Sequence, residues 1–455
     1  MELNSNLFPA GVTYAEFRKH RITSSTMTML DGNLVANDTT RSQGLNCRVF
    51  RDGVWGCAAS PTLTSNNAER LGKIAKDNVI SLAGFGKTKR VADVHSHVET
   101  HLPRKAPWST GQKMDFLETL HAISEKKYPK LVSSTFVLME ELHEKEVVTT
   151  TGSRTSADMA RGTIYLVQTV LNANGEPIRL ADPISGRGSI SDVSLTRAEL
   201  EKRLDLLYKR VLDKTEAVPA HAGLVDCILG PDVTGILAHE AMGHPCEADL
   251  VEGGAVTAGL VGQQVASEMI TMVDFAHSYN GKTLPVPVFV DDEGVEAKDV
   301  TMVDKGILKG FLHNRETAET MGQAPTGNAR SYMFEDEPLI RMRNTLILPG
   351  EAKLEDMIAD VEDGYLLLKT SNGQADTTTE FMFGISLGYE IKNGKLGSAI
   401  KDTTVSGTAI EMLKTVTAVS DDLSVEASGY CGKKQRMVVS MGGPALRSKI
   451  NIGGA

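Results

Sequence analysis

The residues best suited to chemistry lie in one short segment, Gly235–Glu247, with the sequence GILAHEAMGHPCE. His239 and His244 are of the type that binds a metal ion through a neutral imidazole, and Glu240 directly follows the first of them. A glutamate beside such a ligand is the usual base that takes a proton from a water activated by the ion. The segment therefore indicates a hydrolytic metal site.

The spacing of the two histidines requires an irregular helix. They are five residues apart, whereas the common helical zinc motif places them four apart. In a regular α-helix a spacing of five would point the side chains about 140° apart around the axis, too far for one ion. Gly243 can relax the backbone before His244, and Pro245 disfavours an α conformation at His244. We therefore expect a π-like turn or a helix end that lets the imidazoles converge. Histidines near a helix end can also simply pack or face solvent, and the adjacent Glu240 is what favours the metal site.

These residues resemble a known family, the TldD/PmbA metallopeptidases. Active members of that family carry His-Glu-x-x-x-His followed by acidic residues, and this chain has the same types at His239, Glu240, His244, Glu247 and Asp249. The likeness extends over nearly the whole chain. Further segments that resemble the family are Tyr14–Arg18, Asp52–Gly56, Asp291–Gly294, Gly306–Leu308, Thr326–Asn328, Arg341–Thr345 and Gly429–Lys433. Because the metal motif is intact, the chain is similar to the catalytic, TldD-like type.

A cysteine is the third ligand that the resemblance implies. In the family it lies in a Gly-x-Cys-Gly-Lys segment, which here contains Cys431. Cys246 is the alternative, since it follows His244 by only two residues. So short a bite rarely lets both side chains reach one tetrahedral ion, and a lone cysteine near a helix end is often a small buried hydrophobe. We therefore expect Cys431 to be the ligand, although only folding can bring it to His244.

The resemblance implies a zinc-dependent peptidase that hydrolyses unfolded or short peptides. His239, His244 and Cys431 would hold Zn2+, with a water in the open fourth position. Glu240 would take the proton of this water and pass it to the leaving amine. The resemblance also implies a homodimer, or a heterodimer with a related subunit.

Other roles stay open. Glu247 and Asp249 would orient a histidine or bind substrate amines, or they form only a solvated acidic turn. The whole chain could instead be a non-catalytic regulatory or binding protein with structural zinc, or a metal-dependent hydrolase of non-peptide amides. Glu240 disfavours structural zinc, because structural sites fill all four positions with ligands and need no base.

Composition sets the broad class. A chain of 455 residues suggests two or three domains, and 41% hydrophobic with 23% charged residues is typical of a folded globular protein. The net charge of −10 and the pI near 5.6 argue against nucleic acid or an anionic membrane as the main partner. No apolar run reaches the roughly 20 residues needed to span a bilayer, and the N-terminus shows no signal segment. Five sparse cysteines indicate reduced thiols. We expect a cytoplasmic protein.

The predicted fold is α+β. Residues 1–218 would form an N-terminal α/β domain with an antiparallel sheet and helices, and residues 219–455 a mainly β, sandwich-like or barrel-like domain that carries the metal-binding helix. Hydrophobic periodicity and turn signals predict strands at 12–60, 131–150, 163–172, 223–229, 286–290, 346–348, 364–368 and 384–391. Helices are predicted at 65–83, 110–127, from Thr196 towards Pro219, and at 354–361, with a loop at 183–194.

Two further patterns carry weaker signals. His95, His97 and His101 alternate with acidic residues, so in an extended segment they would share one face and could form a second metal site. A solvated polar strand is the favoured interpretation, because no apolar residues back the cluster. Gly84–Thr88 superficially suggests a phosphate loop, but Ser81 occupies the position of the first glycine of that signature.

Overall fold

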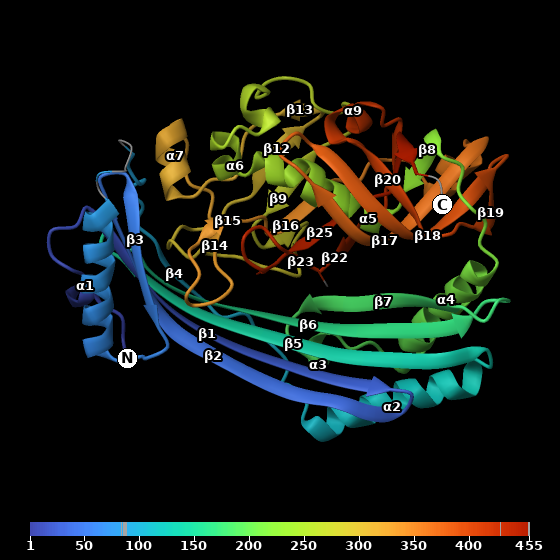
Figure 1. The fold of residues 1–455 in the computed structure, drawn as a ribbon, viewed down its shortest axis with the longest axis horizontal. Coiled ribbons are helices and arrows are strands. Elements are labelled where there is room, and N and C mark those ends of the chain that lie inside the picture. The colour runs from blue at the N-terminus through green and yellow to red at the C-terminus, as the bar shows by residue number, and fades with distance from the viewer. Residues whose placement is uncertain (83, 85–88, 428, 454–455) are drawn as a thin grey trace.

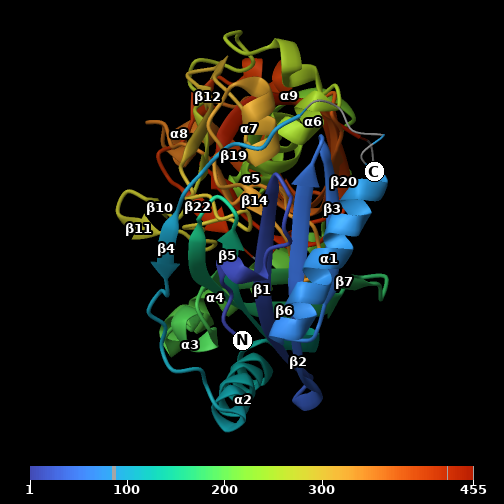
Figure 2. The same cartoon turned by 90° about the vertical axis from the view of Figure 1, so that its left-hand side faces the viewer.

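The molecule consists of a long, mostly antiparallel sheet on which a mainly β C-terminal half rests. The structure is a computed structural model that describes residues 1–82, 84, 89–427 and 429–453. Figure 1 shows the sheet along the lower side and the C-terminal half above it. Figure 2 shows the same two layers from one end. The class is the α+β class expected, with a barrel-like C-terminal half.

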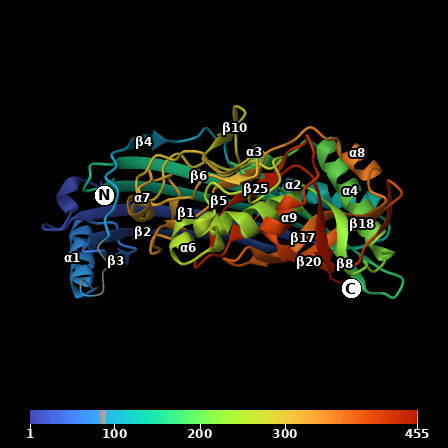
Figure 3. The ribbon, with the colours of Figure 1, turned by 90° about the horizontal axis from the view of Figure 1, so that it is seen from above.

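The lower sheet has the strand order β3-β2-β1-β5-β6-β4, with β7 also beside β6. Its strands are β1 (Tyr14–Leu30), β2 (Asn33–Arg51), β3 (Val54–Ser60), β4 (His97–Thr100), β5 (Leu131–Thr149), β6 (Arg154–Leu171) and β7 (Pro177–Arg187). The longest of them run along most of the molecule, as the view from above shows (Figure 3). The sheet is therefore the platform that supports the C-terminal half.

Three long helices pack on this sheet. α1 (Ser65–Leu82) lies against β2 and β3, while α2 (Thr110–Lys127) and α4 (Arg197–Thr215) share a core with β1, β5 and β6. Capping boxes at Ser109 and Thr196 begin α2 and α4, because each hydroxyl accepts from the backbone N–H three residues on. All three helices were predicted from the sequence.

The predicted loop at 183–194 is wrong. The structure places the end of β7 and the short helix α3 (Ile190–Val193) there. Leu180 and Ile184 of β7 are buried, which the Gly-rich and Ser-rich sequence around them obscured. Pro183 is tolerated because β7 is an edge strand, with β6 as its only neighbour among the described strands.

The C-terminal half contains a sheet that closes into a barrel-like ring. Its order is β17-β8-β26-β20-β18-β19, and the additional pairing of β17 with β18 closes it. Its strands are β8 (Gly223–Leu229), β17 (Asp363–Ala375), β18 (Glu380–Lys392), β19 (Lys395–Ala399), β20 (Thr403–Thr408), β21 (Ala418–Val419), which pairs with β26, and β26 (Leu446–Ile452). Closure leaves few exposed edges and surrounds a core of apolar side chains.

A second sheet and several short elements complete this half. The second sheet contains β13 (Ile307–Leu308), β12 (Val300–Asp304), β9 (Met272–Phe275), β16 (Asn344–Ile347), β25 (Ser440–Gly443) and β22 (Ser424–Glu426), in that order. Two-stranded ribbons are β10 (Ser278–Tyr279) with β11 (Lys282–Thr283), β14 (Ala329–Arg330) with β15 (Leu339–Ile340), and β23 (Tyr430–Cys431) with β24 (Met437–Val438). The helices are α5 (Pro231–Ile236), α6 (Ala248–Glu252), α7 (Arg315–Met321), α8 (Leu354–Ala359) and α9 (Ala409–Lys414).

The strand predicted at 286–290 is also wrong. Apart from a single bridge at Val290, the segment has no strand pairing. Pro285 and Pro287 lack the backbone N–H that a ladder needs, while the alternating valines between and after them imitate a strand. Val286 and Val288 are nevertheless buried, so the sequence pattern identified core residues but not their backbone conformation.

Two other sequence observations concern the glycine-containing segment at 84–88 and membrane-spanning segments. Apart from Gly84, the Gly84–Thr88 segment lies outside the described residues. Within the described part of the chain, no helix has both the length and the apolar character that crossing a membrane would require.

Candidate metal centre

The segment with the two histidines is a π-helix, as its spacing indicated. Leu237–Gly243 continues directly from α5, and the backbone N–H of His244 donates to the carbonyl of His239. This hydrogen bond spans five residues, so residues five apart face the same side. The centroids of the His239 and His244 rings are 5.1 Å apart. The deformation thus brings the two imidazoles together.

A close packing contact fixes where this helix lies. A Cβ on Gly235 of α5 would come within 2.9 Å of the backbone nitrogen of Gly442 in β25. Glycine at this position therefore lets the helix approach the strand backbone directly. This close approach holds the start of the π-helix against β25, the strand of the second sheet that precedes β26.

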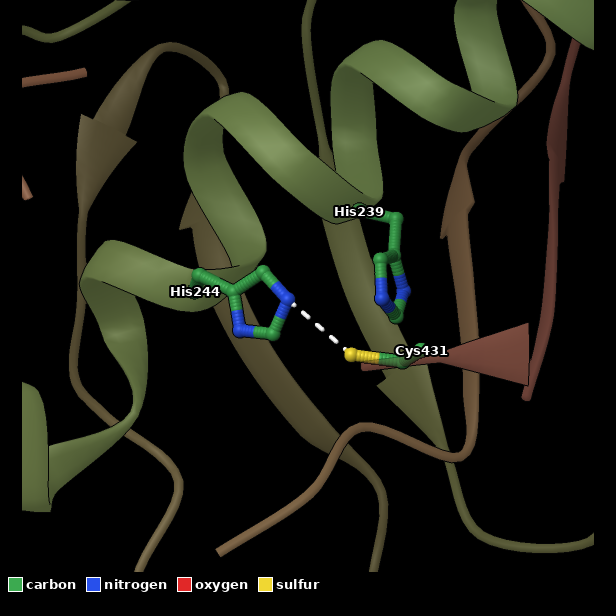
Figure 4. A group of neighbouring side chains, drawn as sticks. All are labelled: His239, His244 and Cys431. Atoms are coloured by element: carbon green, nitrogen blue, oxygen red, sulfur yellow. Dashed lines mark hydrogen bonds between the residues drawn. The ribbon is translucent and has the colours of Figure 1, made fainter. Parts of the chain in front are cut away.

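Cys431 comes from β23 and meets the two histidines. Its Sγ lies 3.1 Å from Nε2 of His244, and one ligand atom from each of His239, His244 and Cys431 lies within 4.8 Å of the others. Figure 4 shows the three side chains pointing towards a common point. In the described part of the chain, no other group of three or more His, Cys, Asp or Glu side chains is close enough to hold an ion.

The rival cysteine lies elsewhere. Cys246 is completely buried in the apolar core of the C-terminal half, and burial raises the pKa of its thiol to about 12. Its sulfur is not in the group of ligand atoms that converge with those of His239 and His244, so Cys246 acts as a small buried hydrophobe. Its place in the fold favours Cys431 as the third ligand.

The chemistry of the three side chains fits zinc. His239 is completely buried, and neither of its ring nitrogens has a hydrogen-bond partner. Buried polar atoms without a partner are costly, and a bound ion would satisfy one of them. Burial alone would raise the pKa of the Cys431 thiol, but the two neighbouring histidines lower it to about 4. Imidazole and thiolate are both ordinary ligands of Zn2+, and three protein ligands leave the open position that a catalytic zinc site keeps.

Glu240 lies between these ligands and a cleft. Its carboxylate oxygens are 3.9 Å from Nε2 of His239 and 3.6 Å from Nε2 of His244. The side chain is partly exposed and lines a cleft of about 540 Å³ between the two halves of the chain. Strands β6 and β7 and helix α4 form one wall, and β17, β22 and β23 contribute to the other. A molecule in the cleft can therefore reach Glu240, whereas the three candidate ligands lie behind it and do not line the cleft themselves.

The acidic residues after the histidines have separate roles. Glu247 is buried and accepts a hydrogen bond of 2.7 Å from Nδ1 of His244, which leaves Nε2 directed towards Cys431. Burial would raise the pKa of the Glu247 carboxyl, but His244 and Lys433 lower it to about 2. Asp249 contacts Lys433 instead of a histidine, at 2.8 Å. The sequence left three roles open for these acids, namely orienting a histidine, binding substrate amines or forming a solvated turn. The structure pairs Glu247 with His244 and Asp249 with Lys433.

Replacing Glu247 by glutamine is expected to weaken zinc binding about 10- to 100-fold. The amide has the shape of the carboxylate but no charge, so it orients His244 less firmly and makes its imidazole a weaker donor. Competition with a chromogenic chelator measures the affinity. Asp249→Asn is the matched control, since it changes the other acid on Lys433 without touching a histidine. Equal affinities in both variants and wild type would contradict this role.

Sequence reasoning missed the side chains that hold the cysteine strand. Arg341, completely buried, donates to the carbonyls of Cys431 at 2.9 Å, Lys433 at 3.0 Å and Gln435 at 2.8 Å. Glu141 and Arg161 of the lower sheet contact the residues just before Cys431. The signal available in the sequence was a charged residue inside an apolar strand pattern, which does not reveal its partner.

The His95, His97 and His101 group is not assembled as a site. His95 and His101 have side chains that are 64% and 57% exposed, and the nearest acids lie at 3.6 Å or more. His97 begins β4, His95 and His101 lie on either side of that strand, and all three residues are exposed. These residues form the solvated polar segment that the sequence favoured.

The site and fold together define an α+β protein with a candidate two-histidine, one-cysteine metal centre at a cleft. A family model described as the PmbA/TldA metallopeptidase C-terminal domain matches residues 222–454, and one described as domain 1 of the same family matches residues 15–80. The chain belongs to the TldD/PmbA metallopeptidase family.

Individual relatives agree with this assignment along the full chain. A metalloprotease of Methanocaldococcus jannaschii is 30% identical over 96% of this chain and 96% of its own length. The zinc metalloprotease TldD homolog of Saccharolobus solfataricus is 27% identical over 98% of this chain and 97% of its own. Among solved structures, TldE from Thermococcus kodakarensis is similar with a TM-score of 0.75 and 18% identity, covering 99% of this chain and 98% of that chain. At that identity the structural likeness shows the fold alone.

Proposed function

We propose that the chain is a zinc-dependent peptidase that hydrolyses unfolded or short peptides. The single observation that carries the proposal is the arrangement at the cleft. His239, His244 and Cys431 converge from inside the protein, and Glu240 lies beside them on the side that faces the cleft. The names of relatives such as the Saccharolobus solfataricus zinc metalloprotease support the same reaction class.

In this proposal His239, His244 and Cys431 hold Zn2+. The ion, when bound, would polarise the peptide carbonyl and make a water more acidic. Glu240 accepts the proton of the attacking water through a carboxylate oxygen and then delivers it to the nitrogen of the leaving amine. Glu247 keeps His244 in the tautomer whose Nε2 is free to bind. The apolar core around the π-helix holds the completely buried His239 away from bulk water.

Structural zinc fits the arrangement less well. A structural site fills four positions with protein ligands, whereas three candidate ligands gather here among the described residues. Glu240 lies beside these three at the cleft, where a base would meet a molecule that enters.

The size of the cleft supports an extended peptide as substrate. A volume of about 540 Å³ is within the range of small-ligand sites and would hold a few residues of an extended chain. Its lining carries charges of both signs, several already paired, such as Asp182 with Arg203 and Asp232 with Lys369. Because these charges are paired within the walls, the cleft does not favour a strongly charged ligand such as nucleic acid.

We further propose that the protein works in the cytoplasm as a homodimer or as a heterodimer with a related subunit.

Removal of the metal tests this function. Dialysis against dipicolinate is expected to abolish cleavage of a denatured protein substrate, and stoichiometric Zn2+ should restore it. Mass spectrometry follows the fragments. The substrate protein in its folded state is the control, and it should stay intact. Full cleavage by the metal-free protein would contradict a zinc mechanism, and cleavage of the folded control would contradict the substrate class.

A further inference from the structure

Two buried charged residues face each other on neighbouring strands of the lower sheet. Glu141 of β5 and Arg161 of β6 are directly paired in the register, and their side chains are 5% and 3% exposed. Nη2 of Arg161 donates to Oε2 of Glu141 at 2.8 Å. Buried charges persist only when they are paired and hydrogen-bonded, so their remaining contacts indicate what they are for.

Those remaining contacts lead to the segment that carries the cysteine ligand. Nη1 of Arg161 donates to the carbonyl of Ala427 at 2.6 Å and to that of Gly429 at 3.0 Å. The guanidinium also lies 4.3 Å from the centroid of the Tyr430 ring, and the Tyr430 hydroxyl donates to Glu141 at 2.5 Å. The lower sheet thus binds the backbone of Ala427 and Gly429 and the side chain of Tyr430, which lie directly before Cys431.

The strand of Cys431 has only a short ladder of its own, and the side chains of the C-terminal half that hold this segment by hydrogen bonds act on Cys431 and the residues after it. β23 is two residues long and pairs with β24 only at Tyr430 with Val438 and Cys431 with Met437. On its other side, Arg341 of the C-terminal half donates to the carbonyl of Cys431. So short a ladder is weak by itself. Two buried arginines, one from each half of the chain, therefore fix where the sulfur lies.

We propose that Arg161, supported by Glu141, is a positioning residue for Cys431, so that the N-terminal sheet completes a metal centre whose candidate ligands all lie in the C-terminal half. The inference rests on the proposed function, because it assumes that Cys431 binds the metal. Arginine is required since its planar guanidinium can meet two carbonyls, a carboxylate and an aromatic face at once. A lysine of similar length has one compact ammonium group and cannot serve all of them.

Cobalt substitution tests the positioning directly. Co2+ bound through a thiolate gives a sulfur-to-metal charge-transfer band, so the band reports ligation by Cys431 and does not depend on peptidase activity. In Arg161→Lys we expect a weaker band and a zinc affinity about 10- to 100-fold lower by chelator competition. Glu141→Gln, a milder change that keeps an acceptor for Tyr430, is expected to show a smaller loss in both readouts.

Arg48→Lys is the matched control. Arg48 is also a buried arginine of the lower sheet, and it also reaches the C-terminal half, through an ion pair with Glu293 at 2.6 Å. Its second ion pair, with Glu16 at 2.8 Å, stays within the sheet, and among the described residues it has no hydrogen bond or ion pair with the cysteine segment. This variant should keep the band and the affinity. Circular dichroism verifies folding, and if Arg161→Lys does not fold, Glu141→Gln decides.

The outcomes separate this inference from the function on which it rests. A normal band and normal affinity in both Arg161→Lys and Glu141→Gln would overturn the positioning role while leaving the metal site intact. An equal loss of the band and of zinc affinity in Arg48→Lys would also overturn it, because any disturbed contact between the two halves would then weaken the metal site to the same extent. A wild-type protein without the band would overturn the cysteine ligand itself.

Discussion

Replacing Glu240 by glutamine is expected to lower kcat/KM on unstructured peptides by about 10²- to 10⁴-fold, the usual contribution of a general base. Glutamine has nearly the same shape but cannot accept a proton at neutral pH. Because Glu240 lies beside the ligands and is not one of the three that converge, the variant should keep its zinc and its fold. Steady-state kinetics and elemental analysis of the same sample measure both effects.

A matched control separates the loss of a base from the loss of a charge. Glu252 on α6 is a partly exposed glutamate whose partner is Lys89 at 2.8 Å, and Glu252→Gln should retain wild-type activity. Undiminished turnover in Glu240→Gln would show that another group takes the proton. Loss of zinc together with activity would show that Glu240 is itself a ligand.

The second large effect is expected for Cys431→Ser, which should lose both zinc and peptidase activity. A serine hydroxyl remains neutral at physiological pH, whereas the two histidines lower the pKa of the Cys431 thiol to about 4. The substitution therefore replaces an anionic sulfur by a poor neutral ligand. Zinc per chain after extensive dialysis, measured by elemental analysis, is the readout.

The control for this prediction is already present in the chain. Cys246→Ser changes a cysteine that lies two residues after His244 and is equally buried, but belongs to the apolar core. It should keep its zinc, although a buried hydroxyl costs about 1–3 kcal/mol of stability. Zinc loss in Cys246→Ser with retention in Cys431→Ser would reverse the assignment of the third ligand.

Local sequence features predicted the elements that local interactions determine. The five-residue spacing with Gly243 and Pro245 indicated the π-helix, and the Thr196 capping box indicated the start of α4. Pairing between distant strands was harder to predict. The region around Pro183 looked like a loop because only the neighbouring β6 gives it strand structure.

The third candidate ligand shows where reasoning from residues ends. No spacing rule connects Cys431 to His244, and its assignment came from resemblance to a family. Arg161 and Glu141 were not predicted at all, since what they hold is set by the docking of the two halves of the chain. A sequence can reveal residues that suit a reaction more readily than the residues that place them.

The most direct test of the central claim is a crystal structure of the zinc-loaded protein with anomalous data collected at the zinc edge. The account predicts one strong peak about 2.0–2.1 Å from a ring nitrogen of each of His239 and His244 and about 2.3 Å from Sγ of Cys431, with an open position facing Glu240. A peak at Cys246, or a fully loaded protein with its zinc elsewhere, would contradict it.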